Sequence, residues 1–187
     1  MTGKVVVNRA MSLDGFIAGP DHAMDPSRWL RLSEFVVPED FAAVAAATGA
    51  MLIGRRTWEV GERMEAAEAG SVDYPFSGPM FLLTHRPLER PVPGVTVLSG
   101  DIGDAVATAL DAAGGKDLEI LGADVAGQCL QRGLVDEILV YVLPILAGDG
   151  IRFSSPGLAR VDLEQVSSRP SGAITMLRYR VLKPPPA

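Results

Sequence analysis

LGADVAGQCL, residues 121–130, is the stretch that decides how this chain folds, because it follows an apolar run and opens a helical pattern. A glycine at the end of a buried strand lets the backbone approach a ligand, and the free N–H groups in the first turn of the next helix favour anions. The same arrangement also turns the chain in α/β domains that bind nothing there, so both interpretations stay open at this point.

A second junction upstream, AMLIGRRTWE at residues 50–59, repeats this pattern of an apolar run followed by glycine. Arg55, Arg56 and Thr57 come directly after that glycine, at the start of a predicted helix. Guanidinium groups, a hydroxyl and backbone N–H groups in this position are suited to grip phosphates. The sequence therefore predicts that two glycine junctions meet at the ligand-facing edge of an α/β sheet.

Composition bounds the class of protein. The chain has 187 residues, 48% of them hydrophobic, which predicts a single domain over residues 1–183 with a loose Pro-rich tail at 184–187. A formal net charge of −6 argues against a nucleic-acid partner.

One cysteine and two histidines make no zinc-binding set, so no metal site is expected. With no targeting or membrane-spanning segment, we expect no membrane partner and a cytoplasmic location.

Apolar and helical stretches alternate along most of the chain, a pattern typical of an α/β sheet. The β-branched run in residues 4–10 predicts a buried central strand. Further strands are predicted at 50–53, 79–84, 94–98, 117–121 and 135–143, and helices at 39–48, 55–64, 102–113 and 123–132. Two last strands, near 158–168 and 173–182, are joined through residues 169–172 and predict an antiparallel hairpin.

Four motifs in this order carry a resemblance to a known family: SLDGFIA at 12–18, GRRTWE at 54–59, GADV at 122–125, and GLVDE at 133–137 followed by PILAGDG at 144–150. The chain resembles the dihydrofolate-reductase-like superfamily, in the branch of the riboflavin-biosynthesis reductase domain. The resemblance covers essentially the whole chain. It implies a mixed, mainly parallel eight-stranded sheet flanked by about four helices, with NADPH lying across the carboxyl ends of the strands.

The resemblance also implies which residues bind that cofactor. Ala10 and Ile17 match positions that flank the nicotinamide, and Thr84, His85 and Arg86 match the contact to the 2′-phosphate that distinguishes NADPH from NADH. The remaining expected cofactor residues belong to the two glycine junctions: Gly54, Arg55, Arg56, Thr57, Gly122, Ala123, Asp124, Val125 and Ala126.

Hydride transfer also needs a proton source. The candidate catalytic acids are Asp40, or its neighbour Glu39, in the first turn of the predicted helix at 39–48, and Asp14 in the SLDG loop. The alternatives are a dipole-stabilising acid for the first and an Asp-Gly turn for the second. We expect the substrate to lie over the nicotinamide in a cavity bounded by Met11, Asp14, Leu143 and Gly148, with the glycine-rich loop closing on it. The expected substrate-binding residues are Asn8, Met11, Trp29, Leu143 and Gly148.

The expected activity is NADPH-dependent reduction of a small heterocyclic substrate, pteridine-like or aminopyrimidine-ribose-like. The closest named activity is 5-amino-6-(5-phosphoribosylamino)uracil reductase. Two alternatives stay open: dihydrofolate reduction, and a dinucleotide-binding protein without turnover. We also expect a homodimer, because the extended apolar strands exceed what one compact face needs.

Overall fold

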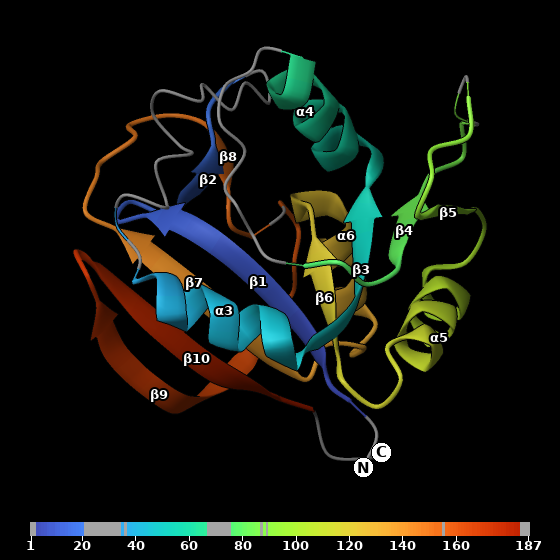
Figure 1. Ribbon diagram of the computed structural model, residues 1–187. Helices are drawn as coiled ribbons and strands as arrows, with labels where there is room; N and C mark the ends of the chain where they lie inside the picture. Colours follow the sequence, from blue (N-terminus) through green and yellow to red (C-terminus); the bar gives the residue numbers. More distant parts are fainter. Residues whose placement is uncertain are drawn as a thin grey trace.

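The computed structural model describes residues 3–20, 35, 37–66, 76–86, 88, 90–154 and 156–183. A mixed eight-stranded sheet runs through these residues in the order β5-β4-β3-β6-β1-β7-β10-β9 (Figure 1). Its strands are β1 (Val5–Ser12), β3 (Thr48–Gly54), β4 (Met80–Leu83), β5 (Val95–Leu98), β6 (Asp117–Leu121), β7 (Glu137–Leu143), β9 (Asp162–Ser171) and β10 (Ile174–Leu182). The helices described are α3 (Pro38–Ala47), α4 (Arg55–Ala66), α5 (Ile102–Ala112) and α6 (Ala123–Gln131).

The first six strands of the sheet are parallel. β5, β4, β3, β6, β1 and β7 pair in parallel, whereas β10 runs antiparallel to both β7 and β9. This confirms the predicted mainly parallel sheet with a C-terminal hairpin. Because the carboxyl ends of parallel strands meet at one edge, the residues after β1, β3, β4 and β6 gather there.

The β-branched run of β1 explains why this strand is central. Val5 and Val7 pack into one apolar cluster with α5 and α6, while Val6 packs into a second cluster with Phe41 of α3. Successive side chains of a strand point to opposite faces, so the run supplies both faces of the sheet. Accordingly α3 lies on one face and α6 on the other (Figure 1).

Two strands were not predicted. β2 (Phe16–Ala18) and β8 (Ile151–Arg152) pair antiparallel in a separate small sheet. They are too short to show an apolar period, and their pairing joins segments that are far apart in the sequence. Their position matters, since β2 packs beside β1 at the ligand-facing edge (Figure 1).

Some element ends differ from the predictions. Thr48 begins β3 rather than ending α3, and its hydroxyl donates to the Val44 carbonyl at 3.0 Å. The hairpin turn lies at residues 172–173, because β9 continues through Ser171 and Gly172 takes the left-handed φ of 58°. In the described part of the chain, the helices are too short or too polar to cross a membrane. The predicted tail at 184–187 lies outside the described residues.

Candidate functional site

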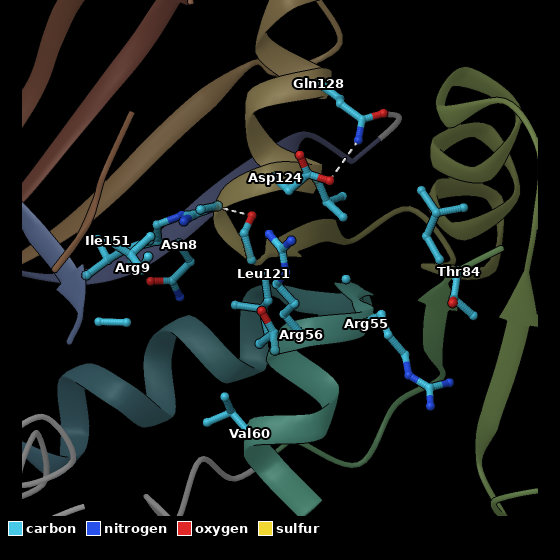
Figure 2. A pocket seen from close by; sticks show the side chains of 18 of the residues that line it. Asn8, Arg9, Arg55, Arg56, Val60, Thr84, Leu121, Asp124, Gln128 and Ile151 are labelled. Atoms are coloured by element: carbon cyan, nitrogen blue, oxygen red, sulfur yellow. Dashed lines mark hydrogen bonds between the residues drawn. The ribbon is translucent and has the colours of Figure 1, made fainter. Parts of the chain in front are cut away.

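A cavity of about 580 Å³ follows the carboxyl ends of the parallel strands (Figure 2). Its lining comes from the ends of β1, β3, β4 and β6, from the first turns of α4 and α6, and from β2 and β8. Residues of this lining are Asn8, Arg9, Ala10, Ile17, Ala18, Gly54, Arg55, Arg56, Thr57, Val60, Leu83, Thr84, His85, Arg86, Gly100, Leu121, Gly122, Ala123, Asp124, Val125, Gln128 and Ile151. The structure thus brings together every predicted cofactor-binding residue except Ala126, which is buried. Their contacts with a cofactor stay a prediction.

The two glycine junctions interlock at the centre of the pocket. Gly122 has a φ of 103°, and a Cβ built there would lie 2.7 Å from the Thr57 hydroxyl oxygen. A Cβ at Gly54 would lie 2.8 Å from a methyl group of Val125. Each glycine therefore makes room for the helix that follows the other strand. Among the described residues there is no cis peptide bond, and Leu121–Gly122 is trans.

One acid organises the cations after β3 and β4. Glu59 accepts a hydrogen bond from Arg55 Nε at 2.7 Å, and its carboxylate lies 3.9 Å from Arg86 Nη2. The hydrogen bond from Arg55, aided by nearby arginine charges, holds the pKa of Glu59 below its usual value. The Thr84 hydroxyl accepts from the Arg86 backbone N–H at 3.1 Å, which fixes the turn that carries Arg86.

Arg9 is the functional candidate that the sequence predictions missed. Only 7% of its surface is exposed, and Nη2 donates to the Gly122 carbonyl. Its guanidinium carbon lies 5.7 Å from the Phe153 ring centre, while Nε and Nη1 have no hydrogen-bond partner. Burial lowers the pKa of Arg9 to about 10. The available signal was an arginine that closely follows the β-branched run Val5–Val7, within the strand predicted to be central and buried.

Asn8, on the neighbouring position of β1, joins a buried polar network beneath the pocket. Its amide donates to Glu119 at 3.0 Å, and the Thr48 hydroxyl donates to the same carboxylate oxygen at 2.8 Å. Burial raises the pKa of the Tyr141 hydroxyl, and the negative charge of Glu119 raises it further. Of the predicted substrate residues that the structure describes, Asn8 is the one that lines the cavity.

The candidate acid Asp14 ties two loops together. Its carboxylate accepts from the Ser12 hydroxyl at 2.6 Å and from the backbone N–H groups of Ala147 and Gly148 at 3.0 and 2.8 Å. These bonds, that from Ala147 foremost, lower its pKa to about 2. Such a carboxylate is ionised at neutral pH and has no proton to donate.

The candidate acid Asp40 also has structural partners. Arg169 of β9 approaches it at 2.5 Å. A hydrogen bond from Ser171, and then the contact with Arg169, lower the pKa of Asp40. Neither Asp14 nor Asp40 lines the cavity, where Asp124 is the one acid among the described lining residues. The proton-donor roles stay predictions to which this geometry gives no support.

The expected substrate cavity does not coincide with the pocket. Met11, Asp14, Leu143 and Gly148 are all missing from the described lining; Leu143 is buried, and Met11 packs against the core. The loop expected to close on a ligand is held in place by its hydrogen bonds to Asp14, which lies 133 residues before Ala147 and 134 before Gly148 in the sequence. Trp29 lies outside the described residues.

Thiol and metal chemistry find no support in the described residues. No three His, Cys, Asp or Glu side chains there are grouped to hold a metal ion. Cys129 is buried, and burial raises its pKa to about 12. The described lining of the pocket presents arginines, hydroxyls and backbone groups instead.

Comparisons with known proteins confirm the fold and the family resemblance. The model of the RibD C-terminal domain matches residues 3–177. A solved structure described as a riboflavin biosynthesis protein from Shewanella sp. PV-4 is 25% identical, with a TM-score of 0.75, and 96% of this chain and 99% of that chain are covered. No curated protein sequence matches the chain.

More distant structures share the fold. RibD of Acinetobacter baumannii has a TM-score of 0.68 at 17% identity, covering 97% of this chain, which spans 59% of that RibD. Dihydrofolate reductase from Enterococcus faecalis, solved with NADP(H) and RAB-propyl, has a TM-score of 0.58 at 14% identity, with 98% and 99% covered. The expected dihydrofolate-reductase-like fold is thereby confirmed.

Proposed function

The chain belongs to the RibD C-terminal domain family, and from that premise we propose that it is an NADPH-dependent reductase of a small heterocyclic compound. The proposed substrate class is pteridine-like or aminopyrimidine-ribose-like, and the closest named activity is 5-amino-6-(5-phosphoribosylamino)uracil reductase. Its solved relatives of the same fold include a riboflavin biosynthesis reductase of Saccharomyces cerevisiae and a dihydrofolate reductase that holds NADP(H).

The charge of the pocket is the observation that carries the proposal. Although the whole chain has a net charge of −6, the described lining holds four arginines and a single acid. A cavity of this composition favours a polyanionic ligand of the size of a dinucleotide. The unpartnered Nη1 of Arg55 adds a buried donor for such a ligand.

Different parts of the pocket fit different parts of the dinucleotide. Arg56 and Arg86, at the β3 and β4 ends, provide charge for the 2′-phosphate, and His85 lies beside them in the lining. The first turn of α6 and the Thr57 hydroxyl provide donors for the diphosphate. Ala10, Ile17 and Ile151 give an apolar surface for the nicotinamide at the β1 end. A bound nicotinamide dinucleotide would supply the hydride, and these residues orient it and exclude water.

Turnover and binding are measured separately to test the proposal. NADPH oxidation, followed by absorbance, is assayed against aminopyrimidine-ribose compounds, dihydropterins and dihydrofolate, and calorimetry gives the affinity for NADPH and NADH. We expect turnover with one heterocycle class and tighter binding of NADPH. Turnover with dihydrofolate alone would change the substrate, binding without turnover would leave a dinucleotide-binding protein, and no binding of either dinucleotide would refute the proposal.

A further inference from the structure

Arg9 is a buried cation whose charge has no acidic partner in the described part of the chain. Its one hydrogen bond, from Nη2, goes to a neutral carbonyl, that of Gly122, and Phe153 offers a ring face. Nε and Nη1 stay without partners although the residue is 93% buried. Two other arginines of the pocket differ from it, since Arg55 and Arg86 share Glu59.

Burying an unpaired charge is unfavourable, and a structural role does not require it. An apolar side chain of similar length would fill the same space beside Phe153 without that cost. A cation in this state is instead suited to a site whose counter-charge arrives with a ligand. The guanidinium fork is also the side-chain group best matched to the oxygens of a phosphoryl group.

The place of Arg9 in the pocket narrows what it binds. Figure 2 shows Arg9 with Asn8 and Ile151 at one end, Thr84 and Arg55 at the other, and Leu121 between them. The hydrogen bond to Gly122 sets the guanidinium beside the N-terminus of α6, where the helix dipole favours anions. Asp124 in that turn accepts a hydrogen bond from Gln128 Nε2 at 3.0 Å, along the helix.

We propose that Arg9 is the charged anchor for a phosphoryl group at the β1 end of the pocket, separate from the cluster of Arg55, Arg56 and Arg86. This inference rests on the proposed function for the identity of the ligand. The phosphoryl oxygens belong either to the diphosphate of the dinucleotide or to a phosphate carried by the substrate. Both sources call for the same charge and the same donors.

Binding of inorganic pyrophosphate tests the proposal without the dinucleotide. Calorimetry compares the wild type with Arg9→Met, Arg9→Lys and the control Arg63→Gln, which removes one positive charge from α4 outside the described lining. We expect Arg9→Met to weaken pyrophosphate binding at least tenfold, Arg9→Lys to weaken it less, and Arg63→Gln to change it less than threefold, because Arg63 is exposed to solvent, which screens its charge.

Competition with NADP⁺ identifies the source of the phosphoryl group. If saturating NADP⁺ blocks pyrophosphate, and Arg9→Met also weakens NADP⁺ binding tenfold or more, Arg9 holds the dinucleotide diphosphate. If pyrophosphate binds beside NADP⁺ and remains sensitive to Arg9→Met, Arg9 holds the substrate's phosphate. A wild type that binds pyrophosphate through Arg9 but does not bind NADP⁺ would refute the proposed cofactor and still support the anchor.

Thermal unfolding distinguishes a ligand anchor from a structural arginine. Without ligand, Arg9→Met should melt at the same temperature as the wild type or higher, because it removes an unpaired buried charge. Equal pyrophosphate affinity in the wild type and Arg9→Met, no pyrophosphate binding by the wild type, or a large fall in the melting temperature of both Arg9→Met and Arg9→Lys would overturn the proposal.

Discussion

Glu59 sets the electrostatics of the pocket at the β3 and β4 ends. Its carboxylate faces Arg55 at 2.7 Å and Arg86 at 3.9 Å, so one acid places two guanidinium groups that start from different strands. Both arginines approach the same oxygen, Oε1, but the contact with Arg86 is long and the Arg86 side chain is 75% exposed. Arg86 can therefore turn toward the 2′-phosphate of a ligand at little cost in free energy, because its contact with Glu59 is weak.

Arg86→Ala is expected to weaken NADPH binding about tenfold, or ~1.4 kcal/mol, because it removes one charge-assisted contact at an exposed site. NADH binding should change little, since NADH lacks the 2′-phosphate. Calorimetric affinities for both dinucleotides check this. Arg63→Ala is the matched control, an exposed arginine of α4 outside the described lining. Equal losses for NADPH and NADH would contradict the assignment of Arg86.

Asp14→Asn is expected to change the acid stability of the protein. The pKa of Asp14 is lowered from 3.8 to about 2 in the folded state, so its stabilising contribution is complete above about pH 4 and is lost as the pH falls toward 2. Melting temperatures measured by circular dichroism from pH 7 to pH 2 should fall more steeply for the wild type than for Asp14→Asn.

Asp149→Asn is the control for this measurement, because Asp149 lies in the same loop and accepts from the Gly150 N–H. It should keep the pH dependence of the wild type. The same variants test the candidate acid. An Asp14→Asn protein of unchanged stability but without turnover would restore Asp14 as a proton donor.

At the scale of the elements, the pocket exists because two strand–glycine–helix units pack side by side. The β6–α6 turn comes so close to α4 that a Cβ at Gly122 would meet the Thr57 hydroxyl oxygen at 2.7 Å. The two helices thereby present their first turns to one cavity. We infer that the lack of space for a side chain, more than the positive φ, requires glycine at position 122.

Gly122→Ala should destabilise the fold by about 1–3 kcal/mol from the positive φ and by a further amount from contact with Thr57. Gly100→Ala is the matched control, since Gly100 has a φ of 108° and open space around its Cβ. Chemical denaturation gives the free energy of unfolding of the wild type, the two glycine variants, Thr57→Ala and the double variant Gly122→Ala/Thr57→Ala. The double-mutant cycle then gives the coupling energy between positions 122 and 57. Equal destabilisation by the two glycine changes would show that steric contact contributes nothing.

At the scale of the whole molecule, the sheet ends in an edge strand with little cover. All residues of β9 except Ser171 are exposed, and Leu163 and Val166 are 42% and 45% exposed. β7, in contrast, is buried between β1 and β10, so of the two apolar segments expected to associate, only the hairpin exposes large apolar side chains. A long edge strand with apolar side chains favours pairing with a second copy.

We expect a homodimer that associates through β9. The double variant Leu163→Lys/Val166→Lys should give the monomer mass in light scattering at micromolar concentration, with an unchanged circular dichroism spectrum. Val97→Lys is the control, because Val97 is 43% exposed on β5 at the opposite edge of the sheet. A monomeric wild type, or a dimer disrupted by Val97→Lys instead, would contradict this interface.

The sequence by itself determined the class of fold and most elements of the sheet. The run Val5–Val7 and the alternation of apolar and helical stretches indicate which elements are buried. Such patterns can be read from neighbouring residues alone. The glycine junctions and the cationic strand ends were likewise visible, because parallel strands bring their carboxyl ends to one edge.

Only the tertiary structure decided which polar groups have partners. Asp14 and Asp40 were both candidate acids in the sequence, but their partners, Ala147 and Arg169, lie 133 and 129 residues away. Arg9 stood unnoticed in an apolar run, and its lack of an acid became evident once β6 and Phe153 were placed around it. Hydrogen bonds and charge pairs depend on distances between remote segments, and no local periodicity records those distances.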